Sequence, residues 1–285
     1  MFSKWRIDDM IQLYSDQLEF KIYRDYNHWN PDFHMHNFYE IFFLRQGNID
    51  FYMNNTKRHI VPGTMVFITD QDIHKSILIS DDIYERAFIH IPPALITSCS
   101  SPLTNLSGCF HSSFGQFFQL SQKQGDLFFN TVQNMIHLEK NKEFGHDIMI
   151  HSELLKILVS ANSLCQSNTE NQFSEQYSRR ICDMIHYIEE HLSENLTLES
   201  IAKHFSIDKY HLCHIFKTET NSTVYHYIQL KRIALAKRLL AEGRSLMEVC
   251  FDAGFNDYNH FITTFKKHSG MTPKKYVQTS CANIQ

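Results

Sequence analysis

Three histidines and a glutamate in the first part of the chain could bind a metal ion or a polar small molecule. His34 and His36 are two residues apart, so on a β-strand their imidazoles point to the same face. Glu40 follows in the same stretch, and His74 comes after a turn at Pro62-Gly63. Three imidazoles and a carboxylate can bind a transition metal with open coordination positions. The same side chains can instead bond strand ends or line a metal-free pocket, and we favour this second interpretation, with no metal or other cofactor.

The last third of the chain carries polar and basic side chains at the starts of helices, where they suit base edges and phosphates. Apolar residues at i, i+3, i+4 and i+7 from Leu198 predict a two-turn helix that Thr197 can cap. After a short turn, Asp208 can cap a second helix from Lys209 to about Glu219. Helix, turn and helix are the signature of a helix-turn-helix motif, here at about 197–218. The outward residues of its second helix are Lys209, Tyr210, His211, Cys213, His214 and Lys217.

The same arrangement occurs a second time, at about 245–267. Ser245 and Glu248 can form a capping box, and Gly254 stands where a helix ends on a left-handed residue. One set of outward polar residues is more often a solvated surface, but the repetition favours a tandem reader of DNA. The outward residues of the second reading helix are Tyr258, Asn259, His260, Thr263, Lys266 and Lys267.

One continuous helix is predicted between the two motifs, from Ser222 to about Glu242. Its roughly 20 residues span about 30 Å, close to the ~34 Å between successive major-groove faces of B-DNA. A single chain could therefore read two adjacent turns of the double helix. The basic residues expected to be available away from its apolar face are Lys231, Arg232, Lys237 and Arg238.

The residues around the histidine cluster have the pattern of a compact antiparallel barrel or sandwich. Turn residues at Asn54-Asn55 and Pro62-Gly63 separate short β-type runs. These runs lie at 41–44, 49–53, 65–68 and 77–79. The spacing of apolar residues becomes helical from about 114 to 164. That helical stretch ends in an apolar stripe of Leu154, Leu155, Leu158 and Val159.

The stretch from Ser160 to Ser178, rich in Ser, Asn, Gln and Glu, indicates a linker between two folded units. We therefore predict an α+β chain. Its parts are an N-terminal β-barrel with a helical dimerisation segment at 1–165, a linker at 166–177 and an all-α domain with two helix-turn-helix motifs at 178–285.

Charge is divided unevenly between these parts, although the net charge of the whole chain is −4. Residues 1–177 carry 13 Lys and Arg against 20 Asp and Glu, whereas residues 178–285 carry 14 against 11. Only the second part has the sign that a phosphate backbone attracts. The seven cysteines are scattered without a C-x-x-C pair, which argues against a disulfide framework or a structural zinc site. Charges near Met1 and the lack of a long apolar run predict a cytoplasmic protein with no membrane partner.

The C-terminal part resembles the AraC/XylS family of transcription regulators over about residues 180–277. The resemblance rests on Arg232–Leu240 and on the signature residues Ala253, Gly254, Phe255, Phe261, Phe265, Gly270, Thr272, Pro273 and Tyr276. It implies that both motifs bind double-stranded DNA, the first with more sequence specificity and the second with more of the affinity. Val277 and His214 stand where many members have arginine, so one phosphate contact and one guanine contact are expected to differ.

The N-terminal part is similar to the cupin-like effector domains of the same family, because the spacing H-x-H-x3-E-x6-G runs from His34 to Gly47. This resemblance implies a small-molecule effector, commonly a sugar. Trp29, Phe33 and Tyr39 could stack on a sugar ring, and Arg86 and His90 could hydrogen-bond it, although each could be ordinary packing. The candidate effector-binding residues are Trp29, His34, His36, Glu40, His74 and Arg86.

The family resemblance further implies a homodimer through the leucine stripe, and RNA polymerase as a partner if the protein is an activator. Two alternatives stay open. The chain could be a metal-binding cupin enzyme or metal sensor that uses His34, His36, Glu40 and His74, or a constitutive DNA-binding protein whose barrel only dimerises. No nucleophile elbow, P-loop or dinucleotide fingerprint is present, so we predict no enzymatic activity.

Overall fold

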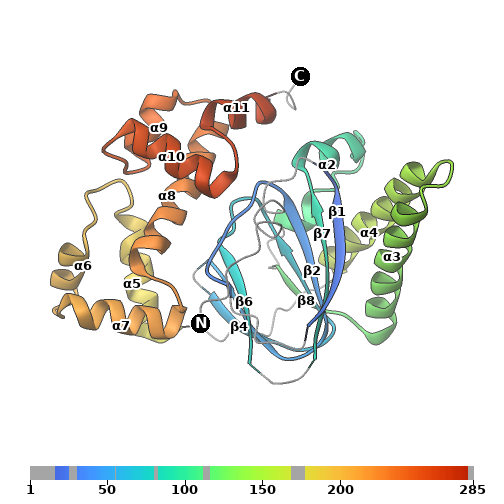
Figure 1. Cartoon of the computed structure of the whole chain (residues 1–285), viewed down its shortest axis with the longest axis horizontal. Helices are drawn as coiled ribbons and strands as arrows, with labels where there is room; N and C mark the ends of the chain where they lie inside the picture. The colour runs from blue at the N-terminus through green and yellow to red at the C-terminus, as the bar shows by residue number, and fades with distance from the viewer. Residues whose placement is uncertain are drawn as a thin grey trace.

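The computed structural model describes residues 17–25, 31–54, 56–79, 83–111, 116–167 and 177–281. Within them, the N-terminal half forms two antiparallel sheets with flanking helices, and the C-terminal half is helical (Figure 1). The larger sheet has the strand order β1-β7-β2-β5-β8 and the smaller one β4-β3-β6. The strands are β1 Glu19–Asp25, β2 Tyr39–Gln46, β3 Ile49–Met53, β4 Thr56–Ile60, β5 Thr64–Ile68, β6 His74–Leu78, β7 Tyr84–Ile91 and β8 Phe117–Gln119.

The larger sheet is buried on both faces. Phe42 and Leu44 of β2 face the smaller sheet and pack with Phe51 of β3 between the two sheets, which together are called the barrel from here on. Ile41 and Phe43 point the opposite way, into a second core under the flanking helices. Burial on both faces explains why β2 reads as a nearly continuous apolar run rather than as an alternating one.

The predicted strands at 41–44, 49–53 and 65–68 lie within β2, β3 and β5, and the run at 77–79 overlaps the end of β6. The predicted turns also occur. Asn54 and Gly63 both adopt left-handed backbone conformations, with φ of 53° and 90°. A Cβ atom on Gly63 would lie 2.7 Å from the Gln119 side chain. Both the left-handed backbone and the lack of space therefore favour glycine at this turn.

Two long helices, α3 (Gln122–Asn141) and α4 (His146–Ser167), form a hairpin on the outer face of the larger sheet, away from the C-terminal helices (Figure 1). Two short helical segments, α2 (Pro93–Cys99) and η2 (Gly108–His111), precede this hairpin. Leu154 and Leu158 of α4 are fully buried, whereas Leu155 and Val159 are 37% and 51% exposed. The apolar stripe of α4 is therefore half core and half surface.

Helix α4 continues to Ser167, so the prediction of a linker starting at Ser160 was wrong. Ala161 and Cys165 extend the buried side of the helix past that point, which composition alone did not reveal. Residues 166 and 167 of the predicted linker at 166–177 belong to α4, and residues 168–176 lie outside the described residues. The segment His146–Gln166 has the length and apolar composition of a membrane-crossing helix, but its inner side packs into the core beneath the hairpin.

The C-terminal half consists of α5, two pairs of short helices joined by a longer one, and α11. Its helices are α5 Arg179–Glu190, α6 Leu198–His204, α7 Lys209–Thr220, α8 Val224–Ala241, α9 Leu246–Asp252, α10 Tyr258–Ser269 and α11 Pro273–Cys281. Thr197, Asp208, Thr223, Ser245 and Asp257 cap five of these helices with side-chain oxygens. The pairs α6/α7 and α9/α10 are the two predicted helix-turn-helix motifs, and the predicted connecting helix is α8.

Candidate DNA-reading surface and buried polar cluster

The first helix-turn-helix motif is held together by the buried faces of α6 and α7. Ile201 of α6 packs with Leu212 and Phe216 of α7, and all three are fully buried. The Asp208 carboxylate accepts a hydrogen bond of 2.9 Å from the main-chain N–H of His211, which lowers the pKa of Asp208. This cap fixes where α7 begins and therefore which side chains point outward.

The predicted reading residues of α7 lie on its outer side. Tyr210 is 82% exposed, and His211, His214 and Lys217 are also exposed. Cys213 is half-buried. Lys209 forms an ion pair, with Nζ 2.7 Å from Oε1 of Glu199. A phosphate contact by Lys209 would therefore compete with an acidic side chain of the preceding helix.

The second motif repeats this construction. Ser245 and Glu248 form the predicted capping box of α9, and Gly254 after that helix has a φ of 84°. Asp257 accepts a hydrogen bond of 2.6 Å from the N–H of His260, as Asp208 does in the first motif. The outward residues Asn259, His260, Thr263, Lys266 and Lys267 are exposed, and Tyr258 is half-buried.

The basic residues of α8 are largely committed to contacts within the protein, which corrects the expectation that they are available. Lys231 Nζ lies 2.6 Å from Oε1 of Glu189. Arg232 donates from Nε and Nη2 to the carbonyl oxygens of Leu192 and Glu194. Lys237 is fully buried. Of the four, Arg238 is exposed.

Lys237 is buried because α8 packs against the barrel. Its ammonium donates hydrogen bonds of 2.7 Å to the main-chain carbonyls of His36 and Asp70. Burial lowers the pKa of Lys237 to about 8. In the opposite direction, Lys75 of β6 donates to the carbonyl of Thr220, the last residue of α7. Each half of the chain thus inserts one lysine into the other.

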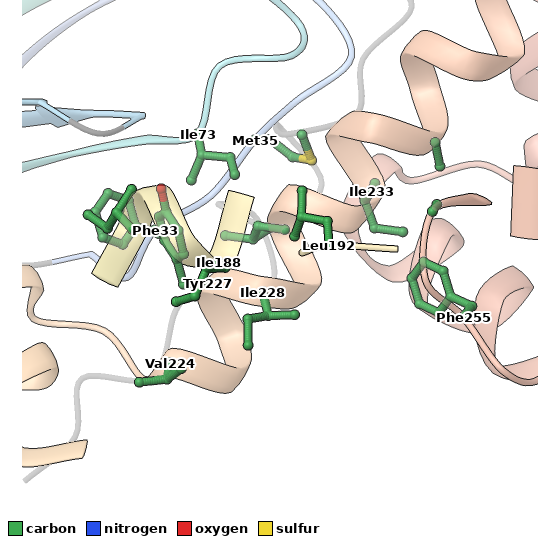
Figure 2. Close-up of a cluster of buried hydrophobic side chains, with 14 of the residues drawn as sticks. Phe33, Met35, Ile73, Ile188, Leu192, Val224, Tyr227, Ile228, Ile233 and Phe255 are labelled. Atoms are coloured by element: carbon green, nitrogen blue, oxygen red, sulfur yellow. The ribbon is translucent and has the colours of Figure 1, made fainter. Parts of the chain in front are cut away.

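An apolar cluster also spans the boundary between the two halves. Phe33, Met35 and Ile73 from the barrel pack with Tyr227 and other residues of the helical domain (Figure 2). Further hydrogen bonds cross the same boundary, including one of 3.4 Å from the Tyr227 hydroxyl to the carbonyl oxygen of Asn54. His226 Nε2 lies 2.8 Å from the carbonyl oxygen of Phe33, and the Tyr276 hydroxyl donates to Asp70 over 3.2 Å. The DNA-reading half is therefore in direct contact with the barrel.

The barrel brings the predicted polar cluster together around Glu40. Its Oε2 atom lies 3.0 Å from Nε2 of His36 and 3.7 Å from Nε2 of His74. His90 is also present, with Nε2 3.3 Å from the same oxygen and Nδ1 3.2 Å from Glu19. The ring of His34 lies 4.4 Å from that of His74.

The charges in this cluster follow from burial and hydrogen bonding. Burial lowers the pKa of His36 and His74, and it lowers that of His34 to about 4. Burial opposes ionisation of Glu40, but hydrogen bonds with His36 and His90 outweigh it, so its pKa is well below the usual range. Burial also opposes a charge on His90, yet its two carboxylate partners raise its pKa. His90 therefore lies between two carboxylates that favour its charged form, beside three imidazoles whose burial disfavours theirs.

The remaining candidates for effector contacts occupy different surroundings. Arg86 is buried on the same strand as His90, with its guanidinium 4.4 Å from the ring centre of Tyr84. Phe33 packs at the domain boundary, and Tyr39 stacks on Phe110 beneath the helical hairpin, so neither lines the barrel interior. Trp29 lies outside the described residues.

Arg58 is an inward-facing residue that the sequence did not single out. In the β3–β4 register it stands opposite Phe51, and its guanidinium lies 4.4 Å from the ring centre of Phe117. Its Nε and Nη1 atoms are buried without a hydrogen-bond partner among the described residues. Ser76 and Tyr84 add two hydroxyl groups, which are 3.1 Å apart. The barrel interior is therefore more polar than its apolar strands suggested.

Two protein-family models match this chain. An AraC-like ligand-binding domain matches residues 19–158, and a helix-turn-helix domain matches residues 201–279. The transcriptional activator RhaS of Salmonella paratyphi A is 24% identical over 267 residues, which are 88% of this chain and 89% of that protein. The uncharacterized HTH-type regulator YbfI of Bacillus subtilis is 24% identical over 227 residues, 80% of each protein.

Solved structures of similar proteins include ToxT from Vibrio cholerae, with 12% identity and a TM-score of 0.40 over 93% of this chain and 98% of ToxT. Another is the C-terminal domain of AraT from Geobacillus stearothermophilus, with 28% identity and a TM-score of 0.36 over 37% of this chain and 88% of that domain. The two family models together span both halves of the architecture described above. The chain therefore belongs to the AraC/XylS family of DNA-binding transcription regulators, with an AraC-like ligand-binding domain ahead of its two helix-turn-helix motifs.

Proposed function

We propose that α7 and α10 enter successive major grooves of promoter DNA and that α7 supplies most of the sequence specificity. The observation that carries this proposal is the matched pair of capped helices, each with an exposed polar outer side. The proposed DNA contacts are Lys209, Tyr210, His211, Cys213, His214 and Lys217 from α7, and Tyr258, Asn259, His260, Thr263, Lys266 and Lys267 from α10. Exposed side chains at a helix start can reach base edges, while lysines neutralise phosphates.

The test is a gel shift of the full chain on DNA from upstream of its own gene. We expect a specific shift that weakens as salt rises. His214→Ala should reduce the preference for this DNA over a scrambled fragment, because it removes a proposed base contact. The control is His186→Ala, since His186 is an exposed residue on α5. Equal preference in wild type and His214→Ala would contradict the assigned role of α7.

We further propose that the barrel binds a small polar effector of the carbohydrate class. Arg58 supports this, because two of its buried guanidinium nitrogens have no hydrogen-bond acceptor within the described part of the chain, and a ligand with hydroxyl groups could supply one. Arg86, His34, His36, Glu40 and His74 are the proposed polar neighbours, and Trp29 is a candidate for stacking. Effector binding would then shift the balance between two arrangements of the barrel and the reading domain.

Titration calorimetry of the full chain with a panel of aldopentoses, hexoses and 6-deoxyhexoses tests the effector class. At least one sugar should bind, and Arg58→Met should weaken that binding at least ten-fold. Arg24→Met is the control, because Arg24 lies on the same barrel but is exposed on β1. If no sugar in the panel binds, the carbohydrate assignment is wrong.

The exposed side of the α3/α4 hairpin is the proposed dimer surface. The exposed residues Leu127 and Val159 line a groove of about 670 Å³, and Glu153 and Lys156 add opposite charges to its lining that suit a second copy. Val159→Glu should convert a dimer to a monomer in light scattering, whereas Ile79→Glu, a change at the exposed residue that follows β6, should not. A monomeric wild type would refute the dimer.

The remaining assignments follow from this role. We propose a boundary between a sensor and dimerisation domain at 1–165 and a DNA-binding domain at 178–285, a cytoplasmic location, and contact with RNA polymerase if the protein activates transcription. We propose no enzymatic activity.

A further inference from the structure

We propose that His36, His74 and Glu40 bind a divalent first-row transition metal ion inside the barrel. Their donor atoms all lie within 4.8 Å of one another. The three residues are 1%, 4% and 7% exposed, so bulk water does not compete for these donors. Two imidazoles and a carboxylate form a donor set that suits zinc, iron and related ions. This inference does not depend on the effector class proposed above.

The hydrogen bonds of the outer ring nitrogens support the site. Nδ1 of His36 lies 2.8 Å from the carbonyl oxygen of Phe38, and Nδ1 of His74 lies 3.2 Å from that of Asp72. A carbonyl oxygen only accepts, so Nδ1 donates in both hydrogen bonds. The Nε2 atoms of both rings face Glu40. Fixing one ring nitrogen on a backbone carbonyl is how proteins orient histidine ligands of metals.

Glu40 completes the donor set. Its Oε2 atom lies 3.0 Å from Nε2 of His36 and 3.7 Å from Nε2 of His74. These separations let one ion contact all three donors.

The surroundings hold the donors in place. Phe38 stacks on His36 with ring centres 4.1 Å apart, and Phe51 lies parallel to His74 at 6.2 Å. His90 bonds Glu40 from the side and is itself held by Glu19. His34, which the sequence analysis included as a possible ligand, stands next to His74 but is not one of the three clustered donors. The site therefore differs from the predicted one by one histidine.

Metal binding by the wild-type full chain is the first test. After chelator treatment, the protein is equilibrated with Zn(II) alone, and bound zinc is counted by mass spectrometry. We expect one ion per chain, with an X-ray absorption spectrum typical of two imidazoles and oxygen ligands. A chain that retains no zinc, or that binds it through sulfur, would overturn the proposal whatever the variants do.

Variants separate this site from the other histidines of a chain that has 18. His74→Gln and Glu40→Gln should each weaken zinc binding at least ten-fold and abolish the visible spectrum of the Co(II) form. His59→Gln is the matched control, because His59 lies on β4 outside the cluster. Wild-type affinity in both cluster variants would overturn the assignment. Because sugar binding is measured separately with Arg58→Met, failure of one proposal does not imply failure of the other.

Discussion

The ammonium of Lys237 donates a hydrogen bond of 2.7 Å to the main-chain carbonyl of His36, 201 positions earlier in the chain. This contact joins the helix between the two DNA-reading motifs to the polar cluster of the barrel. Lys237→Met should keep the side-chain volume but leave the carbonyls of His36 and Asp70 without donors, which typically costs about 1–3 kcal/mol.

The expected result of Lys237→Met is faster hydrogen exchange in residues 33–38 and in α8, with α3 and α4 unchanged. Mass spectrometry of the full chain measures this region by region. The neighbouring Arg238→Met is the control, since Arg238 is exposed on the same helix. Identical exchange in the two variants would mean that the lysine does not hold the domains together.

Gly254 should tolerate no side chain. Its φ is 84°, and a Cβ atom would lie 2.0 Å from the carbonyl oxygen of Leu192. Gly254→Ala should therefore destabilise the reading domain by more than the roughly 1 kcal/mol expected for a left-handed alanine alone. Gly243→Ala isolates that backbone cost, because Gly243 has a φ of 81° but no atom within 4 Å of the added carbon. Similar melting temperatures in the two variants would contradict the close contact with Leu192.

Lys266 is expected to contact phosphate rather than bases. Lys266→Ala should weaken binding to specific and scrambled DNA by similar factors and reduce the slope of log affinity against log salt by about 1. Fluorescence anisotropy over a range of salt concentrations gives this slope. Lys140→Ala on α3 should leave it unchanged. A loss confined to the specific DNA would assign Lys266 to base readout instead.

His268 should make the reading domain sensitive to acid. Burial is the main cause that lowers the pKa of His268 to about 4, and electrostatic interactions with the neighbouring His226 and Lys267 act in the same direction. Its ordinary pKa is about 6.5, so between these values the unfolded chain binds a proton that the folded chain does not. The contribution of neutral His268 to the free energy of unfolding is therefore fully present above about pH 6.5, and it is lost as the pH falls toward 4.

Between pH 7 and pH 5, the free energy of unfolding should fall less in His268→Gln than in the wild type, by up to about 2 kcal/mol. Urea unfolding of wild type and His268→Gln at the two pH values measures the difference. His186→Gln, a change at an exposed histidine, is the control. If both variants lose as much stability as the wild type, burial of His268 does not determine its protonation.

The helix-turn-helix motifs could be predicted because their determinants are local. The spacing of apolar residues and the caps Asp208 and Asp257 act within a few residues, and they fix the helix starts and outward faces seen in the structure. Strands β2, β3 and β5 were recognised for a similar reason, since their apolar runs are short and bounded by turns.

What the sequence did not reveal depends on distant contacts. Lys237 looked like a surface residue of an amphipathic helix, and only the docking of α8 on the barrel buries it. Arg58 lies in a polar-looking strand, and its inward direction follows from its register with Phe51. The extra length of α4 depends on the packing of Ala161 and Cys165 against the sheet side of the hairpin. None of these contacts leaves a pattern within a short window of sequence.

Helix α8 connects the two motifs without a break from Val224 to Ala241, and it has consequences for the arrangement of operator DNA. A continuous helix has no hinge, so the two reading helices keep a fixed separation and a fixed rotational phase. B-DNA turns once in about 10.5 base pairs. Inserting five base pairs between the two half-sites would move one of them to the opposite side of the duplex, beyond the reach of a chain bound at the other. Inserting a full turn would restore the phase but double the separation, so operators of this regulator should tolerate neither insertion.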